Sequence, residues 1–63
     1  MIILADPKFE LYVDSAGKYR FRLKAPNGEV IAVSEGYESE SGARNGIKSV
    51  KINAPKAVIV ELE

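Results

Sequence analysis

The chain has 63 residues, with nine basic and nine acidic side chains and neither Cys nor His. A domain of this size buries only about 60% of the surface that its unfolded chain exposes. Because disulfides and thiolate metal sites are excluded, assembly with a second copy is the remaining means of stabilisation, and we expect a homo-oligomer. The balanced charge argues against a strong, sequence-independent attraction to nucleic acid or to anionic membranes.

The N-terminal residues 1–7 are expected to be an extension that precedes a single domain over residues 8–62. Residues 1–4 are apolar, but this segment is too short for a signal peptide and has no basic flank. No apolar run approaches the roughly 20 residues that a helix needs to span a bilayer. We therefore expect a cytoplasmic protein without a membrane partner.

Two turns of the same form predict tight antiparallel hairpins. Residues 14–17 read Asp-Ser-Ala-Gly and residues 25–28 read Ala-Pro-Asn-Gly, so each has Gly in the fourth position. A type I turn followed by a left-handed residue makes a three-residue hairpin loop of this kind. The first loop would pair Asp14 with Lys18, and the second would pair Ala25 with Glu29.

These pairings fix which side chains share a face of the sheet, because side chains alternate along a strand. In the first hairpin, the expected helix-facing residues are Phe9, Leu11 and Val13 opposite Leu23, Phe21 and Tyr19. In the second hairpin, a strand over about residues 29–34 is expected to place Ile31 opposite Leu23 and Val33 opposite Phe21. Val30 and Ala32 would then lie on the outer face.

A helix is predicted over about residues 40–53, with Ser39 as its N-cap. Its apolar residues follow helical spacing, at Ala43, Ile47, Val50 and Ala54. The helix should end just before Pro55, because the residue before a proline is disfavoured in the helical region. Residues 57–62 follow as a last strand that is apolar on both faces, and such a strand needs cover on both sides.

The sequence also resembles a known family in two specific motifs. Residues 34–37 read Ser-Glu-Gly-Tyr at the corner before the helix, and residues 45–47 read Asn-Gly-Ile within it. Together with residues 9–25 and 27–32, these motifs resemble the YegP-like family of small bacterial and archaeal proteins, which has no assigned activity. The apolar residues 1–4 depart from the family pattern.

The resemblance implies an α+β fold of order β-β-β-α-β, in which an antiparallel meander is packed by one helix. Family members are built either from two tandem repeats or from two subunits, which exchange their C-terminal strands and share one sheet. This chain holds one repeat, so the resemblance implies a homodimer in which residues 56–62 are exchanged. Val58, Ile59 and Val60 would then contact the second subunit.

A strip of small residues lies on one side of the predicted helix, at Gly42, Gly46 and Ser49. Each glycine inside a helix costs about 1 kcal/mol relative to Ala, so a close approach by another group should compensate for it. One interpretation is a contact with the helix or sheet of a second subunit. The other is that Gly46 makes room for a bulky side chain of the same chain, such as Tyr37, and the sequence leaves both open.

Two sets of basic residues could form a surface for an anionic partner. One set alternates along the second strand, at Lys18, Arg20, Arg22 and Lys24; the other lies on the helix, at Arg44, Lys48 and Lys51. The strand set, with Tyr12 opposite Arg20, is similar to a platform for single-stranded nucleic acid. Glu10 and Asp14 oppose two of its cations, however, which favours ordinary cross-strand pairs on a solvated face.

Catalysis is the least favoured function. Without His or Cys the common acid–base and thiol nucleophile arrangements are missing. The corner residues Ser34, Glu35 and Tyr37 are expected to bond to their own backbone rather than to form a site. We therefore expect no enzyme activity, cofactor or metal. The sequence favours a small dimeric binding module with an unidentified protein partner, and weak, salt-dependent nucleic-acid binding is the alternative.

Overall fold

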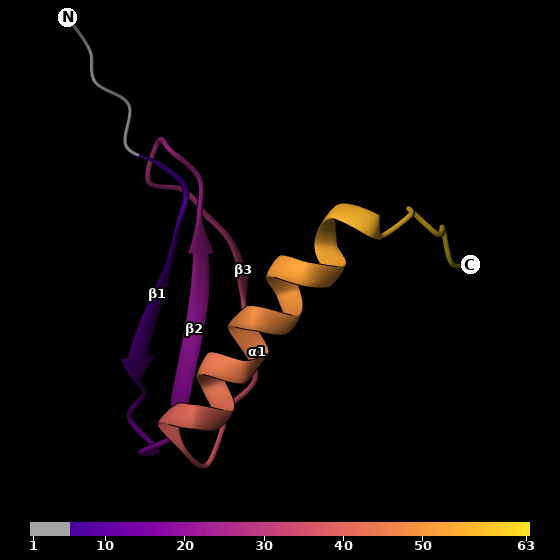
Figure 1. Cartoon of the computed structure of the whole chain (residues 1–63). Helices are drawn as coiled ribbons and strands as arrows, with labels where there is room; N and C mark the ends of the chain where they lie inside the picture. The colour runs from indigo at the N-terminus through magenta and orange to yellow at the C-terminus, as the bar shows by residue number, and fades with distance from the viewer. Residues whose placement is uncertain (1–5) are drawn as a thin grey trace, which may run out of the picture.

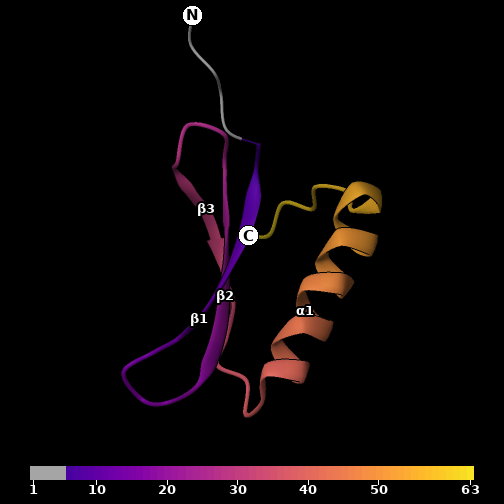
Figure 2. The same cartoon turned by 60° about the vertical axis from the view of Figure 1, so that its left-hand side comes forward.

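The computed structural model describes residues 6–63 and has the expected α+β architecture. Three antiparallel strands, in the spatial order β1-β2-β3, are followed by one helix and a short 3-10 helix. The elements are β1 (Lys8–Val13), β2 (Tyr19–Lys24), β3 (Val30–Val33), α1 (Glu40–Asn53) and η1 (Ala54–Lys56) (Figure 1). Figure 2 shows the helix standing on one side of the sheet, so the molecule has two layers.

Both hairpin turns form as predicted. The backbone N–H of Asp14 donates to the carbonyl of Lys18 at 2.9 Å, and that of Ala25 donates to Glu29 at 2.8 Å. The fourth residue of each turn has the left-handed backbone that glycine adopts most readily, with φ of 81° at Gly17 and 89° at Gly28. The two glycines are therefore required by the turn geometry.

The register is as predicted between β1 and β2 but shifts between β2 and β3. Phe9 lies opposite Leu23, Leu11 opposite Phe21 and Val13 opposite Tyr19, as expected. On the other side of β2, Lys24 pairs with Val30, but Leu23 pairs with Ala32 and Arg22 with Val33. The prediction that Ile31 faces Leu23 and Val33 faces Phe21 is therefore wrong.

The side chain of Ser34 explains this shift. Its backbone N–H donates to the carbonyl of Phe21 at 2.9 Å, while its Oγ accepts the N–H of Phe21 at 2.9 Å. One extra residue in β3 is needed to bring Ser34 opposite Phe21, and Ile31 is left without a partner on β2. As a result, Val33 lies beside Arg22 on the face that points away from the helix, and Ala32 lies on the helix-facing side.

The helix begins and ends where the sequence predicts. The Oγ of Ser39 accepts the N–H of Gly42 at 3.1 Å, which is the expected N-cap, and α1 ends at Asn53, shortly before Pro55. Among residues 6–63, α1 packs against β1 and β2 and makes no contact with β3. The helix therefore covers only part of the sheet, and β3 lies outside its cover.

The core between the two layers is small. Of the described hydrophobic residues, only Phe21 and Ala43 are buried. Phe9 packs edge-to-face on Phe21 with 5.9 Å between ring centroids, and Tyr37 stacks on Phe21 at 6.2 Å. Ile47 remains half-buried on the helix. A single copy thus leaves much of its apolar surface exposed to water.

The last predicted strand does not form in the single chain. After η1, residues 57–63 have no strand partner, although Ala57 has an extended backbone with φ −73° and ψ 135°. Figure 1 shows this segment running on beyond the helix, away from the three strands. A strand forms by pairing its backbone with a neighbour, and residues 57–63 pair with no strand of the described residues 6–63. The expectations for the apolar residues 1–4 lie outside the described residues.

Candidate functional site

The sheet face opposite the helix carries the basic residues of β2, and each of them has an acidic partner. Arg22 Nε lies 2.6 Å from Glu10 Oε1, and Lys24 Nζ lies 3.5 Å from the same oxygen. Arg20 Nε lies 2.6 Å from Asp14 Oδ2. At the start of the strand, Lys18 pairs with Glu38.

Asp14 is the most highly connected carboxylate of this face. Its Oδ1 accepts the backbone N–H groups of Ala16 and Lys18, both at 2.9 Å, while Oδ2 accepts from Arg20. The hydrogen bond from Arg20, followed by that from the Lys18 backbone, lowers the pKa of Asp14 below its ordinary value. Asp14 therefore both fixes the first turn and neutralises a strand cation.

Glu10 has a similar role at the other end of the strand. Its pKa is lowered chiefly by the hydrogen bond from Arg22, with a smaller contribution from the charge of Lys24. The guanidinium carbon of Arg22 also lies 5.0 Å from the centre of the Tyr12 ring. The aromatic face that could stack on a nucleic-acid base is thus covered by an arginine.

The structure therefore brings the strand set of cations together, but it places each of them beside a carboxylate. Among residues 6–63, each of Lys18, Arg20, Arg22 and Lys24 has a carboxylate within 4 Å. The nearby carboxylates partly neutralise these cations and so weaken their attraction for a phosphate. This arrangement supports the interpretation of ordinary cross-strand pairs over that of a nucleic-acid platform.

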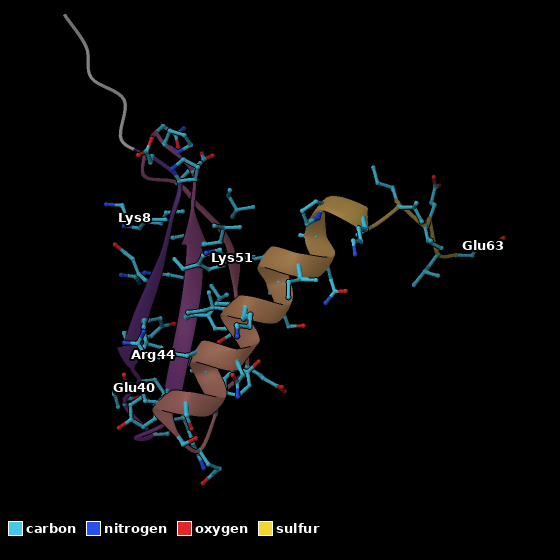
Figure 3. The ribbon with its side chains drawn as sticks, viewed as in Figure 1. Lys8, Glu40, Arg44, Lys51 and Glu63 are labelled. Carbon is cyan, nitrogen blue, oxygen red and sulfur yellow. The ribbon has the colours of Figure 1, made fainter. Side chains whose placement is uncertain are left out.

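The basic residues of the helix are arranged differently. Arg44 Nε bonds to Glu40 Oε2 at 2.8 Å, which is the i,i+4 pair that the sequence indicates. Figure 3 shows Glu40 and Arg44 close together near the start of α1, with Lys51 farther along the same helix. Within the described residues, Lys48 and Lys51 form no ion pair. Two lysines without convergent polar groups do not make a site.

The small residues of the helix face a side chain of the same chain. A Cβ placed on Gly46 would lie 2.5 Å from Tyr37 Oη, 2.9 Å from Tyr37 Cζ and 3.0 Å from Phe21 Cε2. A Cβ on Gly42 would meet Ser39 Oγ at 3.2 Å and Tyr37 Cδ1 at 3.5 Å. Tyr37 thus accounts for the close approach at both glycines, and the strip does not require a second subunit.

The third member of that strip, Ser49, has a local role. The side-chain amide of Asn53 donates to the Ser49 carbonyl at 2.9 Å and lies 3.1 Å from the Ser49 hydroxyl. These hydrogen bonds connect residues within the last turn of α1. Nothing about Ser49 in the single chain indicates a partner.

The corner before the helix satisfies its own backbone, as the sequence indicates. The Ser34 hydroxyl donates to the Glu35 carbonyl at 2.7 Å, and Arg20 Nη1 donates to the Ser34 carbonyl at 2.7 Å. Tyr37 exchanges two backbone hydrogen bonds with Tyr19, at 2.7 and 2.9 Å. The polar groups of this corner are therefore used within the chain.

The geometry of a catalytic or metal centre is not found in residues 6–63. No group of three or more acidic side chains lies close enough to hold a metal ion, and the described chain encloses no pocket. Glu38 and Glu40 each bond to a cation of their own, Lys18 and Arg44. The helices of this part are too short or too polar to cross a membrane.

Among the described residues, the most exposed large hydrophobic side chains lie in the C-terminal segment, defined as residues 57–63. Val58 is 80% exposed, Ile59 99% and Val60 68%. Figure 3 labels Glu63 at the far end of this segment, away from the sheet. The three residues that the sequence assigns to a dimer contact are thus uncovered in one copy of the chain.

The fold is a small α+β unit with one three-stranded antiparallel sheet and one long helix. Residues 14–61 match the family model described as a domain of unknown function, DUF1508, and the chain belongs to this family. It is 64% identical over 56 residues to a UPF0339 protein of Methanosarcina acetivorans, covering 89% of this chain and 97% of that protein. The family resemblance read from the sequence is therefore confirmed.

Two further relatives place the chain among proteins of two lengths. It is 46% identical over 55 residues to the UPF0339 protein YegP of Yersinia pestis. The match covers 87% of this chain but only 49% of YegP. The solution structure of a protein from Haloferax volcanii superposes with a TM-score of 0.84 at 47% identity, covering 94% of this chain and all of that one. The fold is thus shared with a relative solved by NMR.

Proposed function

We propose that the chain is a non-catalytic, dimeric binding module of the cytoplasm, in which two copies exchange residues 56–62. The observation that carries this proposal is the C-terminal segment, whose Ile59 is 99% exposed although the sequence there is that of a buried strand. Leaving such a side chain in water forgoes roughly 1.5–3 kcal/mol of burial energy. A partner strand and a second helix layer would recover it.

The edge of β3 is the best acceptor for the exchanged strand. All four residues of β3 are exposed, and α1 makes no contact with this strand among the described residues. Exposed strand edges pair readily with another chain. A segment from the partner that pairs here would extend the sheet beneath the uncovered half of the helix.

The lengths of the relatives support the same arrangement. YegP of Yersinia pestis is about twice as long as the region that this chain matches. A protein of that length has room for two such units, whereas a single unit must find its second half in another copy. The small core of the single chain, with only Phe21 and Ala43 buried in residues 6–63, agrees with this interpretation.

The dimer is tested by light scattering coupled to gel filtration, together with amide hydrogen exchange. We expect a dimer with protected amides at Val58 to Val60. Val60→Pro should dissociate it, because proline has no N–H for strand pairing. Glu63→Pro, beyond the paired segment, is the control and should leave the dimer intact. A folded wild-type monomer, or unprotected amides at Val58 to Val60, would contradict the proposal.

The binding role is tested by affinity capture with the tagged dimer, with and without nuclease. We expect a stoichiometric protein partner that survives nuclease and high salt, because the strand cations are already paired with carboxylates. Nucleic-acid interactions weaken steeply with salt, since binding releases counterions. Retention that nuclease abolishes would instead support the nucleic-acid alternative.

A further inference from the structure

One end of the sheet carries an excess of positive charge on the face that points away from the helix. We call this part of the surface the basic end. It consists of two adjacent rows of cross-strand neighbours, with Lys8, Lys24 and Val30 in one row and Glu10, Arg22 and Val33 in the next. Three cations and one carboxylate leave the basic end with a net charge of +2.

The ion pairs of the basic end do not remove this excess. Glu10 Oε1 lies 2.6 Å from Arg22 Nε and 3.5 Å from Lys24 Nζ, so one carboxylate is shared by two cations. Lys8 is exposed, and among residues 6–63 no carboxylate lies within 4 Å of its ammonium group. An additional anion would therefore meet attraction here that the chain itself leaves unmet.

The direct pairing of Lys8 with Lys24 strengthens this argument. Like charges that lie opposite each other on neighbouring strands are unfavourable, and a carboxylate placed between them would replace repulsion by attraction. Figure 3 shows Lys8 at β1, on the edge of the sheet that lies away from α1. Farther along the same face, Arg20 and Asp14 pair with each other and add no net charge. The excess is thus confined to the end of the sheet next to the second turn.

The aliphatic neighbours of these cations indicate which kind of anion fits. Val30, 45% exposed, and Val33, 56% exposed, complete the two rows on β3. A single-stranded nucleic acid would need a free aromatic face for its bases, and Arg22 lies over the Tyr12 ring. A protein segment can supply carboxylates for the cations and aliphatic side chains for the valines. The three strands span about 10 Å, which an extended segment covers with about three residues.

We propose that the basic end binds an acidic segment of a partner protein, with carboxylates over the three cations and aliphatic side chains over Val30 and Val33. This inference rests on the proposed binding role, whose partner it names by its chemistry, and it does not depend on the strand exchange. Salt screens the ionic contacts but not the contacts with the valines. Added salt should therefore weaken the complex without abolishing it.

A chemical-shift titration of the isotope-labelled full chain with a synthetic peptide tests this proposal. The peptide has three glutamates followed by Val-Ile-Val, and the control peptide has glutamines in place of the glutamates. We expect the acidic peptide to shift the amide signals of the basic end and to bind roughly fivefold more tightly or better than the control. Glu10→Gln should tighten the binding of the acidic peptide, because it removes the carboxylate that competes with the peptide.

Two variants with the same change in charge locate the site. Lys8→Gln/Lys24→Gln should raise the dissociation constant of the acidic peptide roughly fivefold or more. Lys48→Gln/Lys51→Gln removes two charges from α1, on the other side of the sheet, and should change it by less than about twofold. Equal weakening by the two double variants, or equal affinity for the two peptides, would overturn the proposal.

Two further outcomes would also overturn it. Oligothymidine that binds at the basic end where the acidic peptide does not would identify the occupant as a nucleic acid. A partner protein that the wild type and Lys8→Gln/Lys24→Gln capture equally well would leave the proposed binding role intact but show that the basic end does not carry it.

Discussion

The substitution Gly46→Ala tests the packing of Tyr37 against the helix. An added Cβ would lie 2.9 Å from Tyr37 Cζ and 3.0 Å from Phe21 Cε2, closer than ordinary van der Waals contact. Phe21 is buried, so its ring has little room to move. Tyr37 is stacked on Phe21 at a ring angle of 19°, and displacing one ring therefore disturbs the other. The methyl group must be accommodated by a shift of this aromatic pair.

Two opposing effects set the size of the change. Replacing a glycine inside a helix by alanine stabilises the helix by about 1 kcal/mol. Forcing one extra carbon into a packed contact costs about 1–3 kcal/mol. The free energy of unfolding should therefore fall by about 1 kcal/mol in Gly46→Ala. Gly42→Ala should change it by less than about 0.5 kcal/mol, because the helix gain is opposed by a tight contact of the Cβ with the N-cap Ser39 Oγ at 3.2 Å, whereas Tyr37 Cδ1 lies at an ordinary 3.5 Å.

Urea denaturation of the two alanine variants, each also made with Tyr37→Leu, measures the coupling. Without the Tyr37 ring, only the 3.0 Å approach to Phe21 Cε2 remains, so Gly46→Ala should cost less than it does in the wild type, and the difference is the coupling energy between the two residues. The oligomeric state by light scattering should not change. A Gly46→Ala variant that is more stable than the wild type, or that costs the same with and without the ring, would refute this reasoning. Dissociation of a dimer would instead favour a contact between subunits.

Three further changes test the turns and the ion pairs. Gly17→Ala and Gly28→Ala should each cost about 1–2 kcal/mol in thermal or urea unfolding, because both residues have positive φ and open space around them. Asp14→Asn should lower the melting temperature at pH 7, because the folded state depresses the pKa of Asp14. The difference between the two proteins should be fully present above the ordinary pKa of Asp14. It should vanish as the pH falls through the lowered pKa of the folded state. Glu10→Gln removes the carboxylate shared by Arg22 and Lys24 and should create salt-sensitive binding of single-stranded DNA, measured by fluorescence anisotropy, whereas we expect none for the wild type.

Most of the fold follows from local signals in the sequence. The turns at Gly17 and Gly28, the N-cap at Ser39 and the helix end before Pro55 all lie where short-range geometry places them. Each depends on the backbone preferences of one or two residues. Such preferences do not depend on the rest of the molecule, and they can be read from the sequence alone.

The register of β3 could not be read in this way. A hairpin loop fixes only the first pair of residues, and here the pairing of Ala25 with Glu29 is as expected. The shift lies at Ile31, directly after the pair of Lys24 with Val30, and the shifted register lets the Ser34 hydroxyl accept the N–H of Phe21. A side chain that competes with the ladder in this way is visible in the sequence only as one more serine. The predicted pairing lacks the extra residue, so it is out of register by one residue at Ala32 and Val33.

The glycines of the helix show the same division between local and tertiary information. Spacing places Gly42 and Gly46 on one side of α1, but it does not say what approaches them. Tyr37 reaches them because its backbone pairs with Tyr19 and its ring stacks on Phe21, two contacts between residues far apart in the chain. Both interpretations of the strip require a close neighbour. The folded structure identifies this neighbour as Tyr37.

The parts of the chain that remain uncovered also depend on tertiary packing. One helix covers β1 and β2, which leaves β3 and the C-terminal segment of the described chain without a second layer. The two uncovered parts are complementary, since one is a strand edge and the other is an extended apolar segment that lacks a strand partner. They belong to the same chain yet point apart (Figure 1). In the proposed dimer, each β3 edge would pair with the other copy's C-terminal segment, and neither part already has a strand partner within residues 6–63.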